Sequence, residues 1–564
     1  MTLVSLMLFA VAVLPPSDDV RALEDRLCRI ESEGDASDVM GGFSPFVADI
    51  ARARDLASRQ RADGSWPDVD YVTDRRSGWP PAAHVLDRAV FLAREAFVTR
   101  DAASAAAVRK ALDWWAAAKP RCSNWWYNEI GVPQGFALAA LLVDGWLHDE
   151  DRTRYADYLE CSQIRMTGQN RVWLSRIVMM RGILRRDEML IGRAVEAILG
   201  EVRISDGEGI MDDWSFRQHG PQMQFGNYGA SFIMTLSRLA NVLATTKWAM
   251  SGEQRRILGR LEEDGFRWTL WKGRMDVAAL GRQIVPGAQE GKCRAIERAF
   301  SEFAAGGWTF PEDQPRGFRF FPRSAYAVWR TADWMASVKM HTHEILETET
   351  WVNGENTLGG HLADGALYLY STGREYDGVF PLWGNWRLIP GVTGYIDLPP
   401  VRRPGFVTYP GANEADEMTA SGDGSAAQVD FTLRRDGLSV RKRWRFTPEG
   451  VECTGEGISA TNGASRVATC VEHAFAAPNA AVMPYRDGRL TVRNGAFTYE
   501  IFAPEEAVHA AIEDRVGDWV GIAPPGAGNA VSAGRVLVIW IDHGRLPRDA
   551  SYRYRVTVSA VQPL

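Results

Sequence analysis

The sequence contains little cysteine. Only six of its 564 residues are Cys, and no two of them form a C-x-x-C motif. This scarcity excludes a disulfide-based scaffold, and the spacing argues against a zinc knuckle or a thioredoxin-type site. Cys453 and Cys470 are the closest pair along the chain, but cysteine is often buried as a free thiol, so we expect unpaired thiols.

An excess of positive charge is also absent. The chain has 64 Lys and Arg against 71 Asp and Glu, a net charge of −7, so we expect no nucleic-acid partner. With 46% hydrophobic and 24% charged residues, the composition is that of a globular protein long enough for two to four domains. The 21 Trp residues offer flat faces that suit sugar rings, which keeps carbohydrate among the candidate ligands.

No apolar run is long enough to cross a membrane. The run Leu3–Leu14 is too short for a bilayer and ends at Pro15–Pro16. With Ala10-Val11-Ala12 as a cleavage site, it predicts a signal peptide within residues 1–20, although no basic residue precedes it. We therefore expect a secreted or periplasmic protein. The alternative is that this run forms a buried first helix.

The hydrophobic period divides the chain into two parts. From about residue 40 to 300, apolar residues recur at helical spacing, with short breaks that favour stacked antiparallel helix pairs. Beyond Gly306–Gly307 the period becomes two, as in Tyr552–Val558. Helices followed by strands predict a multidomain α + β protein, with a helical domain at 21–310 and an antiparallel β domain at 311–564.

Four polar and aromatic clusters can carry chemistry: Asn124–Pro133, Thr167–Asn170, Asp206–Gly229 and Trp351–Tyr370. Each has an ordinary explanation when it is considered alone. Asn170 suits a helix N-cap, and the last cluster suits a hairpin loop. His219 and Tyr228 lie nine positions apart among glycines, which fits either a proton-transfer pair or two structural residues.

Together the clusters resemble the polysaccharide lyase family that contains hyaluronate lyases, chondroitin AC lyases and xanthan lyases. The matching motifs occur in the family order over about residues 45 to 400: N-W-W-x-x-E-I-G-x-P at Asn124–Pro133, T-G-x-N at Thr167–Asn170, S-F-x-Q-H at Ser215–His219, G-x-Y-G at Gly226–Gly229, G-R at Gly281–Arg282 and N-x-E-N at Asn353–Asn356. The resemblance implies an N-terminal incomplete α/α toroid followed by an antiparallel β-sandwich domain.

The resemblance also implies the site residues. The catalytic group would be Asn170, His219, Tyr228 and Arg282, with Glu355 supporting it from the β domain. The substrate-binding residues would be Trp125 and Trp126, which stack on sugar rings, together with Asn124, Arg171 and Asn356. Arg171, Arg176 and Arg282 would supply a positive local field for an acidic polysaccharide in spite of the negative net charge.

These residue types suit β-elimination next to a uronic acid. Asn170 and His219 would neutralise the carboxylate while the C5 proton is removed, as an oxyanion hole does. Tyr228 would abstract that proton as phenolate and protonate the leaving oxygen on C4, which would leave a 4,5-unsaturated uronosyl end. Free tyrosine has a pKa of about 10, so Arg282 would be needed to favour phenolate, and Glu355 would orient Arg282 or His219. His219 as the base, with Tyr228 as the acid alone, is the alternative.

Two departures from the family pattern bear on the substrate. Pro286 stands where the family commonly carries a second Arg, and Trp214 replaces a Gly, which predicts a narrower cleft. Hyaluronan or chondroitin is the expected substrate type, with xanthan or another uronate polysaccharide as the alternative. We expect no catalytic metal and no cofactor, while a structural calcium ion is compatible with the sequence. We also expect a monomer.

Two other classes of protein compete with the lyase interpretation. A glycoside hydrolase would need opposed carboxylates, for which Asp212, Asp213 and Glu129 are the candidates. A binding protein could have kept the cleft and lost catalysis. The presence of the complete Asn, His, Tyr and Arg set favours an enzyme, an inference that rests on the family analogy.

Overall fold

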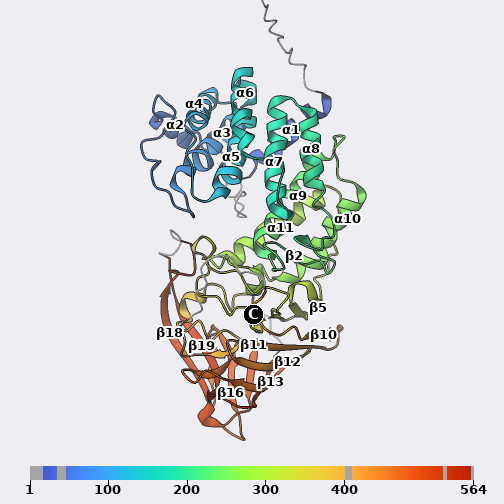
Figure 1. The fold of residues 1–564 in the computed structure, drawn as a ribbon, viewed down its shortest axis with the longest axis vertical. Helices are drawn as coiled ribbons and strands as arrows, with labels where there is room; N and C mark the ends of the chain where they lie inside the picture. The colour runs from blue at the N-terminus through green and yellow to red at the C-terminus, as the bar shows by residue number, and fades with distance from the viewer. Residues whose placement is uncertain (1–16, 35–45, 400–409, 525–529, 560–564) are drawn as a thin grey trace, which may run out of the picture.

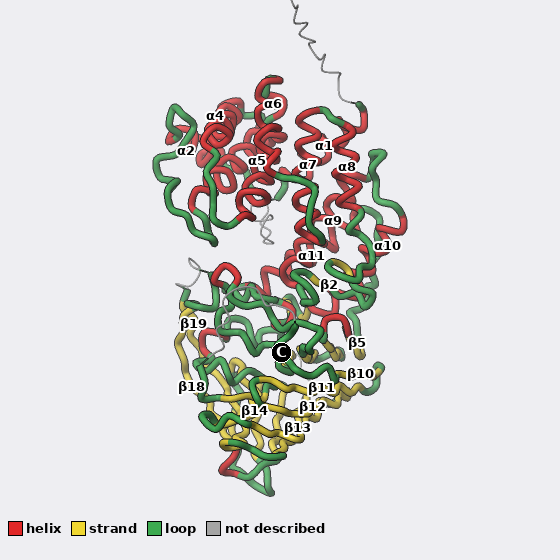
Figure 2. Tube along the Cα trace, in the orientation of Figure 1, coloured by secondary structure: helices red, strands yellow, loops and turns green. Residues whose placement is uncertain are grey.

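The computed structural model describes residues 17–34, 46–399, 410–524 and 530–559. Helices occupy the first part of the chain and strands the second, and the two parts lie one above the other (Figure 1, Figure 2). The last long helix ends at Ala305 and the first strand of the second part begins at Gly317. The expected division between residues 310 and 311 falls in the segment between them.

The helical part consists of helices that pack side by side. Among the pairs in contact are α3 with α4 and α5, α7 with α8, and α9 with α11. The helices are α1 (Asp18–Ser32), α2 (Ile50–Arg59), α3 (Val90–Thr99), α4 (Ala102–Ala118), α5 (Val132–Leu142), α6 (Asp149–Tyr158), α7 (Gly168–Arg185), α8 (Glu188–Leu199), α9 (Ala230–Leu243), α10 (Gly252–Arg260) and α11 (Ala288–Ala305).

Side-chain caps set several of these helix starts. The Asp101 carboxylate accepts a hydrogen bond from the Ser104 amide of α4 at 2.8 Å. At α10, Ser251 and Gln254 form a reciprocal capping box, with distances of 2.9 and 3.2 Å. Such caps satisfy amide groups that have no partner inside the helix. Four short strands interrupt the helical part: β1 (Gly209–Ile210), β2 (Phe216–Arg217), β3 (Leu270–Trp271) and β4 (Arg274–Met275).

The described strands of the second part form three antiparallel sheets. The first pairs β5 (Gly317–Phe321), β6 (Tyr326–Arg330), β7 (Met335–Lys339) and β8 (Ala366–Tyr370) in sequence order. The second has the order β10-β11-β12-β13-β20-β17-β16-β15, and the third the order β18-β19-β14-β9. Their strands are β9 (Thr393–Tyr395), β10 (Met418–Gly422), β11 (Ala427–Arg435), β12 (Leu438–Thr447), β13 (Gly450–Ala460), β14 (Arg466–Phe475), β15 (Ala481–Val482), β16 (Leu490–Asn494), β17 (Phe497–Ile501), β18 (Val508–Asp518), β19 (Val531–Arg545) and β20 (Ala550–Val558).

Strand β20 illustrates how the period of two builds the sandwich core. Tyr552, Tyr554 and Val556 are buried, while Arg553 and Arg555 are exposed, as the alternation predicts. All three buried residues belong to one apolar cluster that also contains residues of the other two sheets. The sheets therefore enclose a shared core, which is the arrangement of a sandwich.

A second apolar cluster joins the helical part to the strands. Phe321 of β5 is fully buried, and its ring centre lies 5.7 Å from that of Phe225 in the helical part. Asp276 reinforces the junction, because its carboxylate accepts a hydrogen bond of 2.7 Å from Tyr370 of β8. The two parts therefore pack as neighbours with a common core, which holds the facing loops in place.

The apolar run expected to form a signal peptide lies outside the described residues, so that expectation stays a prediction. Helix α1 begins at Asp18 and buries Val20 and Leu23, with α5 and α9 packed against it. Residues 18–20 thus belong to a packed helix. No helix in the described ranges is long and apolar enough to cross a bilayer.

All six cysteines lie in the described part of the chain, and every one of them is a free thiol. Cys453 and Cys470 are both buried. The expectation of unpaired thiols is therefore confirmed.

We predict that Phe321→Ala lowers the free energy of unfolding by about 3–5 kcal/mol, because the substitution leaves a cavity where the two parts meet. Denaturant unfolding would measure this change. Val72→Ala is the matched control, since Val72 is 92% exposed and its loss should change stability by less than about 0.5 kcal/mol. Equal stability of the two variants would contradict the shared core.

Candidate active site

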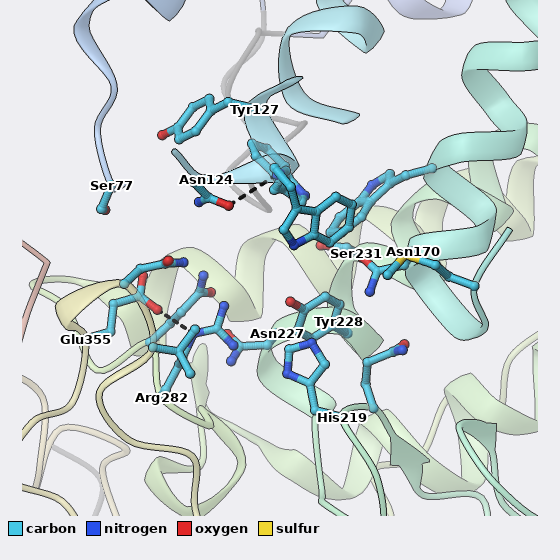
Figure 3. Close-up of a pocket in the computed structure, with 18 of the residues that line it drawn as sticks. Ser77, Asn124, Tyr127, Asn170, His219, Asn227, Tyr228, Ser231, Arg282 and Glu355 are labelled. Carbon is cyan, nitrogen blue, oxygen red and sulfur yellow. Dashed lines mark hydrogen bonds and ion pairs between the residues drawn. The ribbon is translucent and has the colours of Figure 1, made fainter. Parts of the chain in front are cut away.

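A cavity of about 480 Å³ opens where the helical part faces the loops that follow β7. It is lined by all five expected catalytic residues: Asn170, His219, Tyr228, Arg282 and Glu355. Three of the expected substrate-binding residues, Asn124, Trp125 and Trp126, line it as well. Figure 3 shows the side chains of His219 and Tyr228 facing each other below Asn124 and Tyr127. Segments far apart in the chain therefore form one site, since Arg76 and Glu355, which are 279 positions apart, both line the cavity.

Tight backbone packing positions Tyr228. It lies in a single π-helical turn, Phe225–Gly229, that continues into α9. A Cβ atom on Gly226 would lie only 2.5 Å from the carbonyl oxygen of Ala279, so only glycine permits this approach. The glycine therefore brings the turn that carries Tyr228 against the segment that leads to Arg282.

Arg282 is buried and bound by two carboxylates. Its Nε donates to Glu355 Oε2 at 2.6 Å, and its Nη1 donates to Glu349. The exposed fractions of Arg282, Glu349 and Glu355 are 6%, 1% and 8%. Both glutamates come from the loop after β7, so the strand part holds an arginine of the helical part. Glu355 thus supports Arg282, as the family resemblance implied.

Glu349 also binds His219, and sequence reasoning missed it. Its Oε1 lies 2.8 Å from Nδ1 of His219. Because Glu349 is ionised, it accepts this hydrogen bond and Nδ1 carries the hydrogen, so Nε2 is the ring nitrogen on the other side from Glu349. Glu349 lies six residues before Glu355 in a plain Thr-Glu-Thr stretch. No motif marks it, and only the tertiary contact reveals its role.

The electrostatics of the carboxylates follow from these contacts. Burial by itself raises the pKa of Glu349, but the charge of Arg282 and the hydrogen bond with His219 outweigh burial and lower it to about 2. For Glu355, burial outweighs the attraction of Arg282 and raises the pKa. Burial disfavours the Arg282 cation, yet Glu349 raises the pKa of Arg282 above its ordinary value. The guanidinium is therefore charged throughout the working range of an enzyme.

Tyr228 is a neutral phenol in this site. Burial raises its pKa, and the Arg282 cation, whose Cζ is 5.7 Å from the ring centre, opposes this only in part. Glu349 adds to the rise. The rings of His219 and Tyr228 meet edge to face with centres 4.6 Å apart. Arg282 thus favours the phenolate, as expected, but burial outweighs it and the pKa of Tyr228 stays raised.

Asn170 does not cap a helix, so that ordinary explanation is wrong. The N-cap of α7 is Thr167, and Asn170 is the third residue of the helix. Its side chain makes no hydrogen bond with any described residue, and its Oδ1 is buried without a partner. Buried polar atoms are nearly always satisfied. An unsatisfied amide at a cavity wall is thus suited to a ligand.

An aromatic wall formed by Trp125 and Trp126 borders the cavity. The Trp126 ring packs edge to face on Trp173, with centres 6.0 Å apart. Asn124 shapes this turn, since its Oδ1 accepts from the Trp126 amide at 3.2 Å and its Nδ2 donates to the Arg76 carbonyl at 2.8 Å. Both tryptophans are half-buried. Their remaining exposed surface can contact a sugar ring.

Two expected substrate contacts lie elsewhere. Arg171 is not among the residues that line the cavity; it donates to the Met166 carbonyl at 2.7 Å and pairs with Glu201 at 3.5 Å. Asn356 is fully buried, and its Nδ2 donates to the Glu349 carbonyl at 3.0 Å. Asn356 therefore positions Glu349 instead of lining the cavity.

Two further expectations are corrected. Arg176 is buried against Glu31 at 2.6 Å, so neither it nor Arg171 supplies positive field at the cavity. Trp214 does not line the cavity, and the Arg260 guanidinium covers its ring at 4.9 Å. Trp214 has φ 69°, the left-handed region that favours glycine. The family's glycine at this position is thus explained by backbone conformation and not by the width of the cleft.

The carboxylates proposed for a hydrolase are dispersed. Asp212 forms an ion pair with Arg323 at 2.9 Å, Asp213 accepts from Ser215, and Glu129 pairs with Arg165. None of the three lines the cavity. No group of three or more His, Cys, Asp or Glu side chains suited to a metal ion occurs in the described ranges. The three carboxylates proposed for a hydrolase are therefore not placed to act as its acid and base.

The two parts of the chain match two domain models of one protein family, in the same order along the sequence. Residues 50–301 match the N terminal alpha-helical domain of polysaccharide lyase family 8, and residues 316–562 match the super-sandwich domain of the same family. The incomplete toroid followed by a sandwich is thereby confirmed.

Curated relatives and solved structures agree with this match. Chondroitinase-AC of Pedobacter heparinus is 27% identical over 543 residues, which is 89% of this chain and 76% of the relative. Hyaluronate lyase of Thermasporomyces composti is 26% identical over 97% of this chain and 80% of the relative. The chondroitin AC lyase of Streptomyces coelicolor A3 in complex with chondroitin sulphate shares the fold, with a TM-score of 0.82 at 22% identity over 97% of this chain and 83% of that one.

We predict that Glu349→Gln lowers the free energy of unfolding by about 3–5 kcal/mol near pH 7, because the variant leaves a buried cation with one partner fewer. In the native protein the pKa of Glu349 is lowered to about 2. Its stabilising contribution is therefore present above the unfolded pKa and is lost as the pH falls towards 2, so the difference between the two proteins should shrink by about 3 kcal/mol. Denaturant unfolding between pH 2 and 7 would measure it.

Glu150→Gln serves as the control, since Glu150 is exposed on α6. This variant should differ little from the native protein at every pH. A stability loss in Glu349→Gln that is constant with pH would contradict the ion-pair network.

Proposed function

Because the chain belongs to polysaccharide lyase family 8, we propose that it cleaves a uronic-acid-containing polysaccharide by β-elimination and leaves a 4,5-unsaturated uronosyl end. The main support is the pairing of His219 with Tyr228 in a cavity that also contains an unsatisfied Asn170 amide. The relatives are named for chondroitin, hyaluronate and xanthan, and each of these polymers carries uronic acid.

Asn170 and His219 bind the carboxylate of the uronic acid. Removing the C5 proton places a second negative charge next to that carboxylate, which is the main obstacle to the reaction. The amide of Asn170 can donate a hydrogen bond to this charge as it develops. The imidazole, held by Glu349 through Nδ1, adds a positive charge and an Nε2–H donor beside it once Nε2 has taken up a proton. These residues supply the neutralisation themselves, so we propose that the elimination requires no catalytic metal.

Tyr228 donates the proton to the leaving O4. A tyrosine with a raised pKa rests as a phenol and carries the proton that the departing oxygen needs. The C5 proton goes either to Nε2 of His219 or to Tyr228 after Tyr228 has passed its own proton to that nitrogen. In both routes one proton leaves C5, one reaches O4, and the C4–O4 bond breaks as the double bond forms.

The cavity favours a chain of low charge density. Among its lining residues the cations are Arg76 and Arg282, and two glutamates already balance Arg282. At the position where the family commonly has a second arginine, Pro286 occupies an exposed turn before α11. We therefore propose hyaluronan or an unsulfated chondroitin-type chain as the substrate, with xanthan as the alternative.

The proposed location of the protein follows from the size of its substrate. Such polymers are too large to enter a cell intact, so we propose that the protein acts after secretion or in the periplasm. We also propose that it acts as a monomer.

We predict that Tyr228→Phe lowers the rate of elimination by about 10²-fold or more, because the phenol proton is lost while the ring packing remains. The measurement is the ultraviolet absorbance of the conjugated alkene during incubation with hyaluronan, chondroitin, xanthan and alginate. Tyr127→Phe is the matched control, since Tyr127 lines the same cavity but its hydroxyl is bound to the Gly78 amide at 3.1 Å.

The control variant should stay within a few-fold of the native rate. New reducing ends without absorbance would identify hydrolysis and would contradict elimination. Binding of a polysaccharide without any cleavage would identify a non-catalytic binding protein.

We predict faster cleavage of chemically desulfated chondroitin than of sulfated chondroitin of the same length. The two substrates differ only in sulfate groups, for which the cavity offers no cation beyond Arg76 and the balanced Arg282. Initial rates at low ionic strength, where charge effects are least screened, would give the ratio. An equal or higher rate on the sulfated chain would contradict the proposed preference.

A further inference from the structure

A second cavity of about 680 Å³ lies on other segments of the chain. Its lining comes from the region around β3, the second half of α11, residues 310–316 and the end of β6. It shares no lining residue with the catalytic cavity, so it is a separate site on the same molecule.

Two buried arginines form its inner wall. Arg330 is 2% exposed and Arg267 is 9% exposed. Arg330 Nη1 donates to the Arg267 carbonyl at 2.6 Å, and Arg267 Nη2 donates to the Asp313 carbonyl at 2.8 Å. Neither guanidinium is within ion-pair distance of a carboxylate in the described ranges, and Arg330 Nε is buried without a hydrogen-bond partner. The inner wall therefore carries positive charge without a direct carboxylate partner among the described residues, although the more distant Glu263 attracts Arg267.

The two arginines of this cavity differ from Arg282, which is paired with two carboxylates. The pKa of Arg330 is lowered to about 10, mainly by burial, with Tyr326 acting against this shift and the neighbouring Arg267 adding to it. Burial also lowers the pKa of Arg267. Buried charges are ordinarily paired because desolvation disfavours them strongly. An anion in the cavity would supply the missing partner.

The acidic residues of the cavity do not fill this role. Glu297, Glu312 and Asp313 are exposed at its rim, as are Lys272 and Arg316. Water and salt screen such exposed charges. The rim is thus mixed in sign, while the interior is cationic.

Aromatic rings lie beside the arginines. Phe300 and Phe310 are half-buried, with ring centres 5.3 Å apart. The Arg330 guanidinium lies 5.2 Å from the ring centre of Trp271, which fixes its plane by a cation–π contact. A guanidinium recognises carboxylate or sulfate in a planar, bidentate manner, and an aromatic face packs on the apolar face of a sugar.

We propose that this cavity is a second carbohydrate site, which binds an acidic sugar residue with its anionic group on Arg330 and Arg267 and its ring against Phe300 and Phe310. A lone inorganic anion would use the arginines but leave the phenyl rings without a role. The site goes beyond the proposed lyase function, since it binds without cleaving. It would hold a chain at a distance from the catalytic cavity.

Isothermal titration with a hyaluronan tetrasaccharide tests the proposal. The protein carries Tyr228→Phe so that the ligand is not cut. Two binding events are expected. Arg330→Gln should weaken one of them about tenfold or more, because a charge-assisted hydrogen bond contributes about 1.5–3 kcal/mol. Trp125→Ala should weaken the other.

Arg294→Gln is the matched control, since it removes an equal charge from an exposed position of α11 and should change neither event. Phe310→Ala provides a second variant at a half-buried position, in case Arg330→Gln fails to fold, and it should weaken the same event as Arg330→Gln. Failure of the proposed elimination would leave these results unaffected, because they measure binding alone.

Three outcomes would overturn the proposal. The first is a set of binding events that neither Arg330→Gln nor Phe310→Ala changes. The second is sulfate ion bound at this site as tightly as the tetrasaccharide, which would identify a simple anion site. The third is equal binding of a neutral N-acetylglucosamine tetramer, which would remove the role of the arginines.

Discussion

The buried ion pairs of Arg282 with Glu349 and Glu355 tie the two parts of the molecule together. The cation belongs to the helical part and both carboxylates to the loop after β7. A movement of one part relative to the other would break these ion pairs and leave a buried charge without its partner, which is strongly disfavoured. The same Glu349 binds His219. The packing of the two parts and the geometry of the catalytic residues therefore depend on one set of contacts.

The buried arginines at the two cavities differ in whether they are paired with carboxylates. Arg282 is fully paired, so its charge serves to hold glutamates and histidine in place rather than to attract a polymer. Arg330 and Arg267 are left without carboxylates, which makes their cavity receptive to an anion from outside. The negative net charge of −7 is compatible with both kinds of arginine. At a buried site the local electric field, and not the net charge of the protein, determines which ligand binds.

Much of the fold and part of the site could be predicted from the sequence. The change of hydrophobic period located the end of the helices, and the ordered motifs identified Asn170, His219, Tyr228, Arg282 and Glu355, all of which line one cavity. Prediction failed where the role of a residue depends on the direction in which its side chain points. Arg171 follows Asn170 directly, yet on a helix adjacent side chains point about 100° apart, so Arg171 turns to Glu201 instead. Asn356 follows Glu355 directly, but its side chain also points in a different direction from that of its neighbour and is buried in the core.

The sequence by itself determined which residue types are present, their order, and the helical or strand character of each segment, because these follow from local periodicity and turn chemistry. Only the tertiary structure decided the ionisation of the site. Burial raises the pKa of Tyr228 and outweighs the Arg282 cation that lowers it, and two glutamates from a distant loop pair with that cation. Desolvation and charge pairing depend on what surrounds a group in space, and residues far apart in sequence supply those surroundings.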